Sequence, residues 1–387
     1  NWNMSSFSWI GMSSITSDNA YKGSDPGDPG RDKDLLDAFK FTSSTLVFAE
    51  VWEEHYKGIQ RANQTLSRIV AFENLDEDLR NRLIGETKFL RALIYFRLVK
   101  CFGGVPLIAG TDSLDKDLSE VLKRASQKDV YAFIEKDLED AITKLPKKSE
   151  YEAAQIGRAT EGAAKALLAK VSMYQNKWQE AWDLTDEIMK SNEYDLTPSY
   201  EDIWKEVGEN NIESIFEIQA AGGVPAAGVD KYCTVQNPRG TGGWGWGFNT
   251  PSQDLADSYE VGDTRKEATI IFRGETLFDG REIPITVENP MYNQKAYASE
   301  FTTADQTGKN IRVLRYAEVL LINAEAALKI GKDAGLPLKL VRNRAGLDDG
   351  NPTEANIWKE RRHELAFEHD RFFDLVRQGR AGEVLRN

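Results

Sequence analysis

The amino-acid sequence predicts a mainly α-helical protein in which an irregular helical-repeat scaffold carries a loop-rich, partly β ligand-binding lobe. Leucine, alanine and aromatic residues recur at helical spacing through much of residues 46–219, and the same pattern returns in 312–387. Residues 220–311, between these stretches, are rich in glycine and follow no helical period. With an N-terminal loop region at 1–45 packed on the scaffold, we expect four regions within one integrated domain, the last returning to the scaffold.

Residues that favour loops or end helices indicate where the first elements begin and end. Residues 1–45 are expected to form loops, because "SDNAYKGSDPGDPGRDKD" has Gly, Pro, Ser or Asp at most positions. Helical spacing begins at Leu46. The long helices that follow should end where the chain reaches Gly103-Gly104 and, later, Pro146.

A weak internal repeat runs through the helices. The stretches "GETKFLRALIYFRL", "TEGAAKALLAKVSMY" and "RYAEVLLINAEAALKI" each place Ala and Leu at helical intervals after a Glu. The second continues into Tyr174, Trp178 and Ala181, a spacing that resembles a tetratricopeptide hairpin. Because the copies are unevenly spaced, we predict an irregular tetratricopeptide-like array. Four tryptophans at helical spacing are expected in the core: Trp52, Trp178, Trp182 and Trp358.

The lobe should contain short strands. Residues 263–289 alternate apolar and polar side chains around a turn at Asp279-Gly280. A stretch this long without helix, inside a compact helical protein, is typical of a functional region or of disorder. Its many aromatic residues favour function.

Composition excludes several classes of partner. The chain has 387 residues, and 49 Lys and Arg against 62 Asp and Glu give a net charge of -13. Nucleic acid and anionic lipid surfaces are therefore poor partners. No apolar run approaches the about 20 residues of a spanning helix. The two cysteines, Cys101 and Cys233, are compatible with one disulfide or with two buried free thiols, and we favour free thiols.

Two motifs that suggest enzymatic chemistry lack the required context. Gly240, Gly242 and Gly245 match a dinucleotide fingerprint, but the motif lies in a loop and no helix follows it. The stretch "HELAFEH" places His363 and His369 six residues apart, whereas a zinc-binding pair needs a separation of four on one helix face. We therefore predict no cofactor and no metal site.

Acidic residues leave one enzymatic alternative open. With 62 Asp and Glu, many carboxylate pairs arise by chance and nothing marks one pair out, so a glycoside hydrolase or lyase remains a rival hypothesis. Asp25, Asp28, Asp32 and Asp34 offer oxygen ligands for Ca²⁺ but lack the alternation of an EF-hand loop. We favour a solvated acidic loop there.

The strongest candidates for ligand binding are two tryptophans in "WGWGF". Glycines remove the local packing partners of Trp244 and Trp246, so these rings are expected to stack on a ligand such as a sugar, or else to fold back as a lid. The proposed platform has four further members in the lobe: Arg239, Asn249, Tyr292 and Tyr297. Its other side is assigned to the N-terminal loop region, with Trp9, Asp18, Asn19 and Tyr21.

Six stretches together resemble a known family, the SusD/RagB-like outer-membrane lipoproteins of Bacteroidetes polysaccharide-utilisation systems. The first is "W-x3-Y-x2-I-x2-AN" from Trp52 to Asn63, followed by "GETKFLRALIYFRLVKCFGGVPL" and "RATEGAAKALLAKVSMYQNKWQEAW". The others are "RYAEVLLINAEAAL", "VRNRAGL" and "ERRHELAFEHDRFFDLVRQG". They follow one another in family order from residue 46 onward.

The resemblance implies a binding protein and not an enzyme. It implies capture of oligosaccharide or polysaccharide at the cell surface and delivery to a SusC-like TonB-dependent transporter. It also implies attachment to the outer membrane only through an N-terminal lipid anchor that lies outside this chain. Besides the glycoside hydrolase or lyase, a third hypothesis is a protein-interaction scaffold whose only partner is the transporter.

Overall fold

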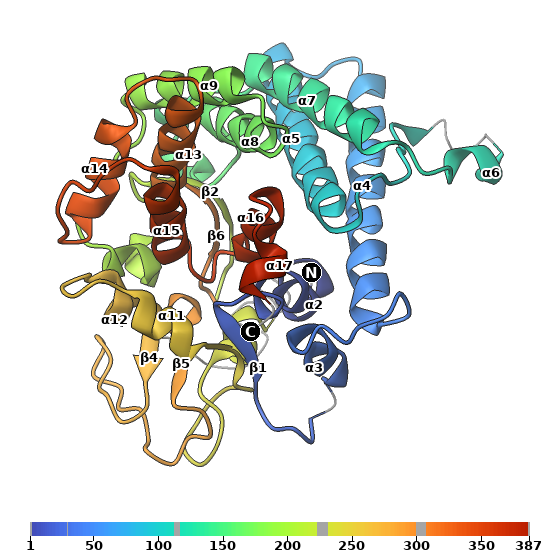
Figure 1. The fold of residues 1–387 in the computed structure, drawn as a ribbon. Coiled ribbons are helices and arrows are strands. Elements are labelled where there is room, and N and C mark those ends of the chain that lie inside the picture. Colours follow the sequence, from blue (N-terminus) through green and yellow to red (C-terminus); the bar gives the residue numbers. More distant parts are fainter. Residues whose placement is uncertain (1, 29, 112–116, 223–230, 299–306, 386–387) are drawn as a thin grey trace.

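The structure is a computed structural model that describes residues 2–28, 30–111, 117–222, 231–298 and 307–385. Helices form an arch over the top and both sides of the molecule, and the lobe with its short strands lies beneath (Figure 1). Two parts of the predicted lobe, 223–230 and 299–306, lie outside the described residues. The prediction of a mainly helical, tetratricopeptide-like fold is confirmed.

Successive helices of the scaffold pack as antiparallel neighbours. They are α4 (Leu46–Ala71), α5 (Glu77–Phe102), α7 (Gln127–Lys144), α8 (Glu161–Tyr174) and α9 (Trp178–Lys190), and each contacts the next. Side chains cap three of these helices at their N-termini: Asp76 on α5, Ser126 on α7 and Thr160 on α8. α5 ends before Gly103, which has a φ of +69°, so the predicted stop is confirmed.

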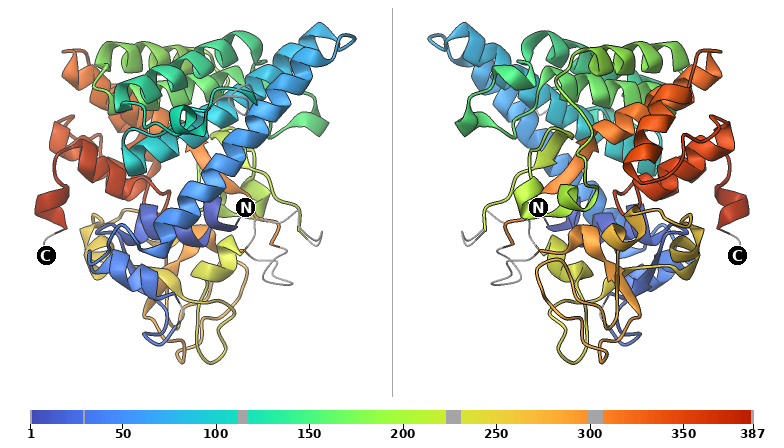
Figure 2. Two further views of the ribbon diagram at one scale, coloured as in Figure 1. Left: turned by 90° about the vertical axis from the view of Figure 1, so that its right-hand side faces the viewer. Right: turned by 90° about the vertical axis from the view of Figure 1, so that its left-hand side faces the viewer.

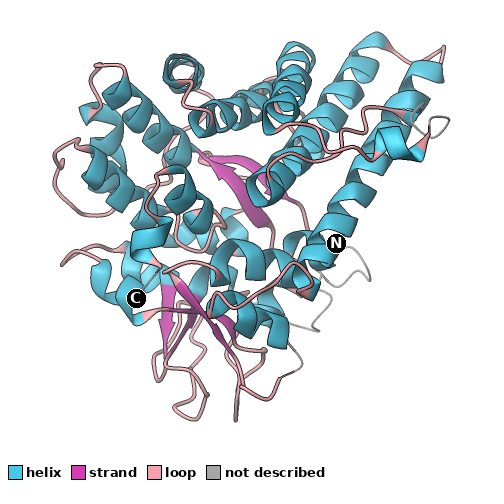
Figure 3. Ribbon diagram, turned by 45° about the vertical axis from the view of Figure 1, so that its right-hand side comes forward, coloured by secondary structure: helices cyan, strands magenta, loops and turns pink. Residues whose placement is uncertain are grey.

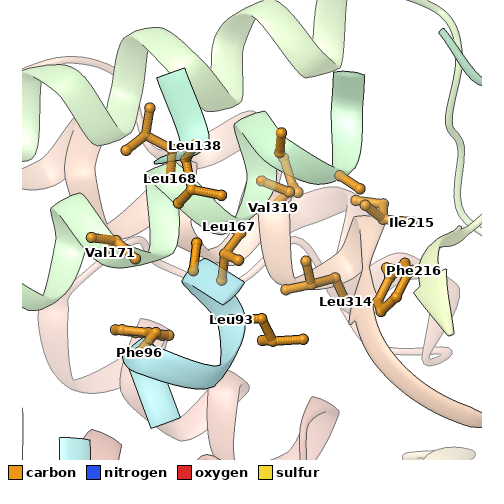
Figure 4. Close-up of a cluster of buried hydrophobic side chains, with 14 of the residues drawn as sticks. Leu93, Phe96, Leu138, Leu167, Leu168, Val171, Ile215, Phe216, Leu314 and Val319 are labelled. Carbon is orange, nitrogen blue, oxygen red and sulfur yellow. The ribbon is translucent and has the colours of Figure 1, made fainter. Parts of the chain in front are cut away.

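The chain returns to this scaffold through α13 (Tyr316–Lys329), which packs against α8 and α9. In Figure 4, Leu167 of α8 and Val319 of α13 meet Leu93 of α5 and Leu138 of α7. Each of these side chains is buried, and burial of one such side chain stabilises the fold by about 1.5–3 kcal/mol. The core therefore joins helices that are more than a hundred residues apart in sequence.

Four further helices follow α13. These are α14 (Gly335–Arg344), α15 (Glu354–Glu364), α16 (Arg371–Arg377) and α17 (Ala381–Val384). α15 packs against α13 and α14, whereas α16 contacts the N-terminal π-helix at Gly11–Ile15. The C-terminal helices thus touch both the scaffold and the N-terminal region.

The described residues form three two-stranded antiparallel sheets, two of which join different regions. β1 (Ala20–Gly23) pairs with β3 (Phe248–Pro251), β2 (Ser214–Ile218) with β6 (Ile311–Arg315), and β4 (Ile270–Phe272) with β5 (Met291–Asn293). In Figure 3, β2 and β6 lie among the helices, and the other strands lie in the lower part of the molecule. The β1–β3 pair places the N-terminal region beside the lobe, with Tyr21 opposite Thr250.

The N-terminal region contains more helix than expected. Short helices α1 (Trp2–Ser5), α2 (Phe7–Ile10) and α3 (Arg31–Asp37) stand where we expected loops. Ser13 and Thr16 donate hydrogen bonds to carbonyls four residues earlier, while Ile10 and Ile15 are buried. Burial against the rest of the molecule therefore stabilises helical turns that the Ser-rich sequence alone does not predict. The remaining short helices are α6 (Leu118–Val121), α10 (Tyr232–Gln236), α11 (Gln253–Ser258) and α12 (Arg265–Thr269).

Cys101 and Cys233 are both free, as favoured. Burial raises the pKa of each thiol to about 12, so the neutral form is favoured. Of the four tryptophans expected in the core, Trp52, Trp178 and Trp182 lie partly buried at its edge. Trp358 is also partly buried and donates a hydrogen bond to Glu325 at 2.9 Å. Within the described residues, no helix combines the length and the apolar character that crossing a membrane requires.

A buried ion network ties the regions together. Glu364 of α15 lies 2.5 Å from Arg344, 3.0 Å from Arg315 and 3.1 Å from Arg265, measured between carboxylate oxygens and guanidinium nitrogens. Glu213 pairs with Arg315 and Arg344 from the other side. All five side chains are almost fully buried. Burial alone would raise the pKa of Glu364, but the three guanidinium groups outweigh it and hold the pKa well below its usual range.

Candidate functional site

Arg239 connects the N-terminal region to the lobe where both reach the surface. Its Nη1 donates to Asp28 Oδ2 at 2.8 Å and to Ser24 Oγ at 3.1 Å, and its Nε lies 3.1 Å from Glu288 Oε2. Below it, the Tyr292 hydroxyl donates to the Arg239 carbonyl at 3.2 Å and accepts from the Asn289 amide. These contacts fix the relative positions of three loops.

Trp244 lies partly buried between other lobe side chains. Its ring meets Tyr297 edge to face at a centroid distance of 6.1 Å, and the Arg281 guanidinium lies 4.5 Å from the ring centre. The Tyr297 hydroxyl donates to Asp279 Oδ2 at 2.5 Å. Tyr297 is therefore a buried support for Trp244, and Arg281 covers one side of the indole.

Trp246 packs into a different cluster. It meets Phe7 edge to face at 6.3 Å, and Lys231 Nζ lies 5.8 Å from its ring. The backbone between the two tryptophans turns tightly, because the amides of Trp244 and Gly245 both donate to the Pro238 carbonyl. A Cβ at Gly245 would lie 2.5 Å from Asn237, so this turn requires glycine.

Of the four residues of the N-terminal region that were predicted to bind ligand, three are held inside the protein and one is exposed. Trp9 is only 2% exposed and stacks on Phe373 in the core. Asp18 accepts two hydrogen bonds from Arg371, at 2.7 Å each, and buried Asn19 accepts one from Arg362. Tyr21, by contrast, is 52% exposed.

Asn249 does not face solvent either. It is fully buried with a φ of +56°, and its side-chain amide donates to Gln236 at 2.8 Å. Together with Trp9, Asp18, Asn19, Tyr292 and Tyr297, this residue supports the loops and does not present a free polar group or ring face. The structure thus departs from the predicted ten-residue platform, because these side chains lie largely inside the protein and make their contacts there.

Besides Asp18, whose carboxylate is held by two arginines, four of the ten predicted residues remain accessible in part. Trp244, Trp246 and Arg239 are half-buried, and Tyr21 is exposed. Rings of this kind offer apolar faces, and the adjoining loops carry charged and amide groups. Such a surface can hold an amphipathic ligand without covalent chemistry. That these residues bind a glycan stays a prediction.

A second concave surface was missed by sequence reasoning. We call it the α4 groove; it has a volume of about 450 Å³ and lies between one face of α4 and the chain around Pro106, Ile108 and Leu122. On α4 it is lined by Trp52, Tyr56, Gln60, Asn63 and Gln64. Sequence reasoning assigned Trp52 to the core, although the series W-x3-Y-x3-Q-x3-Q on one helix face was visible in the sequence.

The acidic loop is held by basic side chains in the structure. Asp28 pairs with Arg239, and Asp34 with Lys22 at 2.9 Å. Asp32 pairs with Lys33. Within the described residues, no group of three or more His, Cys, Asp or Glu side chains is arranged to hold a metal ion.

Comparison with known families gives two matches along the chain. Residues 36–173 match a family described as starch-binding and associating with the outer membrane. Residues 279–387 match the SusD family. Among curated proteins, a SusD-like protein of Bacteroides ovatus is 27% identical, over 87% of this chain and 67% of its own. SusD-like protein P2 of Formosa agariphila is 28% identical, over 93% of this chain and 77% of its own.

Solved structures give the same result over almost the whole chain. A laminarin-binding SusD-like protein is 31% identical, with a TM-score of 0.83, covering 98% of this chain and 87% of that one. Surface glycan-binding protein A from Bacteroides thetaiotaomicron, in complex with laminarihexaose, is 26% identical, with a TM-score of 0.84, covering 97% and 85%. Both of these relatives are described as binding a glycan. From its sequence and its fold alike, the chain belongs to the SusD family.

Proposed function

We propose that this protein captures a neutral oligosaccharide at the bacterial cell surface and passes it to a SusC-like TonB-dependent transporter. In this proposal the lobe at 220–311 and the adjoining N-terminal loops bind the glycan, while the helical scaffold holds them in place. An N-terminal lipid anchor outside this chain attaches the protein to the outer membrane.

One observation carries the glycan-binding part of the proposal. A relative that matches 97% of this chain with a TM-score of 0.84 has its structure in complex with laminarihexaose. Since a second relative is described as laminarin-binding, laminarin is the first ligand to test, followed by a panel of other neutral glucans. The exposed ring of Tyr21 and the half-buried rings of Trp244 and Trp246 are the proposed contacts.

Replacing either lobe tryptophan should weaken glycan binding. An aromatic face contributes about 1–1.5 kcal/mol, so Trp244→Ala and Trp246→Ala should each lower affinity for the cognate glycan roughly tenfold. Both rings are only partly buried, so the melting temperature should change little. Retardation in native gels that contain each polysaccharide, followed by calorimetry with the hit, measures the effect.

A matched control is Phe72→Ala, which removes an exposed aromatic ring at the C-terminal end of α4. This variant should bind glycan like the wild type. Normal binding by both tryptophan variants, or unfolding of either one, would place the glycan contacts elsewhere.

The two rival functions are separated by simple assays. A glycoside hydrolase or lyase would release reducing ends from the polysaccharide, and we expect none. A scaffold that binds only the transporter would migrate normally in every glycan gel. Transfer to the transporter is tested by co-purification: the lipid-anchored protein, extracted from outer membranes in mild detergent, should elute together with a SusC-like protein.

A further inference from the structure

We infer that the α4 groove is a second binding site for a neutral oligosaccharide, separate from the lobe. The choice of ligand class rests on the proposed function, whereas the existence of the groove does not. Figure 2 shows α4 as a long helix that rises from the N-terminal region along one side of the scaffold. The groove therefore belongs to the scaffold, and its lining shares no residue with the ten predicted lobe and N-terminal positions.

The groove has the shape of a linear track. Trp52, Tyr56, Gln60 and Gln64 follow one another at intervals of four residues, so they lie on one face of α4. With a rise of 1.5 Å per residue, the series extends over about 18 Å. This length accommodates several sugar rings in a row, and the groove volume of about 450 Å³ is within the usual range for ligand sites.

The second wall of the groove is fixed to the helix by hydrogen bonds. The Tyr56 hydroxyl donates to the Pro106 carbonyl at 2.8 Å, and Asn63 Nδ2 donates to the Ile108 carbonyl at 2.7 Å. Arg91 donates to Asn63 Oδ1 at 2.6 Å and holds the amide in place. A groove that is formed before the ligand arrives loses less conformational entropy on binding.

Aromatic rings supply the apolar part of the track. Trp52 and Tyr56 are both half-buried, with ring centroids 5.0 Å apart and planes inclined by 39°. Phe102 meets Trp52 edge to face at 5.1 Å and supports it from the core side. The rings of Trp52 and Tyr56 thus line the groove and are held in place by their neighbours. Rings fixed in this way can stack on sugar rings.

The polar part of the track is neutral and unpaired. Gln60 and Gln64 are exposed, and neither makes a hydrogen bond to another described residue. Lys57, the one cation among the described residues of the lining, is paired with Glu53 at 2.8 Å and with Glu54 at 3.0 Å. Side-chain amides both donate and accept, which suits hydroxyl groups.

These features favour a sugar over other ligands. An acyl chain would cover the two amides without giving them hydrogen bonds, which costs free energy. Among the lining residues that the structure describes, an anionic or cationic ligand would meet no unpaired charge of opposite sign. A neutral ligand with apolar faces and a rim of hydroxyl groups matches both the rings and the amides.

Titration of laminarihexaose and of other neutral glucan hexasaccharides by calorimetry tests the inference. The wild type should bind the cognate sugar at two sites. Trp52→Ala should weaken one site about tenfold, and Trp246→Ala the other. Because loss of Trp52 can disturb packing, the surface variant Gln60→Ala/Gln64→Ala is made in parallel and should weaken the same site as Trp52→Ala. Trp178→Ala, which removes another half-buried scaffold tryptophan, is the matched control and should leave both sites intact.

The outcomes separate this inference from the proposed function. One site per molecule, weakened by Trp246→Ala but not by either α4 variant, overturns the inference and leaves the function standing. A wild type that binds no glucan of the panel contradicts both. Loss of transporter co-purification in the α4 variants, with glycan binding unchanged, would identify the groove as a protein-docking surface and also overturn the inference.

Discussion

At pH 5 the folded protein should be less stable than at pH 7.5, and three buried histidines that resist protonation should together contribute about 6 kcal/mol to this loss. Burial, together with the nearby Arg97 guanidinium, lowers the pKa of His55 and of His369 to about 3. Burial and Arg265 lower the pKa of His363 to about 3 as well. All three imidazoles are therefore neutral in the folded state across the neutral and mildly acidic range.

The direction of the effect follows from proton uptake. In the unfolded chain each histidine titrates near 6.5 and binds a proton below that pH, whereas the folded protein does not bind it until about pH 3. Stability is thus lost as the pH falls from 6.5 toward 3, by about 2 kcal/mol per histidine at pH 5. Carboxyl groups with a lowered pKa, such as Glu260 at about 2, reduce the stability of the folded protein only below about pH 4.5.

Urea unfolding between pH 4.5 and 7.5 measures this dependence. The variant His55→Gln removes one of the three groups, so it should reduce the slope of stability against pH by about one third whatever its stability at pH 7.5. A flat profile between pH 5 and 7.5 would show that the three histidines are protonated in the folded state or reach solvent.

The second large effect is expected from Glu364→Gln, which should lower the free energy of unfolding by about 3–5 kcal/mol. The substitution keeps the shape of the side chain but removes the negative charge that Arg265, Arg315 and Arg344 share. Each arginine keeps another carboxylate partner, Asp263 for Arg265 and Glu213 for Arg315 and Arg344. Without the anion that they share, however, part of the cost of burying three guanidinium groups is no longer offset. Chemical denaturation at pH 7.5 gives the difference from the wild type.

The matched control for this variant is Glu260→Gln. Glu260 also pairs with two cations, Arg342 at 3.0 Å and Lys359 at 3.2 Å, but it lies at the surface, where a pair contributes about 0–1 kcal/mol. Equal losses in the two variants would contradict the view that burial gives the network its importance.

The helical scaffold was predictable because its signals are local. α5 ends just before Gly103 and α7 ends two residues before Pro146, and the spacing of Ala and Leu indicates the faces that meet in the core. The strand at Ile270–Phe272 likewise lies within the segment whose alternation predicted short strands. These features depend on residues within a few positions of one another.

The candidate site was less predictable because burial of polar groups is not local. Asp18 looks like a free loop carboxylate in the sequence, but its partners Arg362 and Arg371 come from the other end of the chain. Trp52 looks like a core residue, but whether its ring is covered depends on the path of the segment after Pro106. One sequence does not show either arrangement.

The buried ion network also constrains the order in which the molecule assembles. Arg265 and Arg315 precede Glu364 in the chain by 99 and 49 residues, so during synthesis these cations emerge well before their shared anion. Until α15 has been made and has docked, Arg265 and Arg315 have other partners, such as Asp263 and Glu213, but lack the anion that they share. Contacts that far apart in sequence form slowly. We therefore expect docking of α15 to be a late step of folding, in which the lobe and β6 are joined to the C-terminal helices through Glu364.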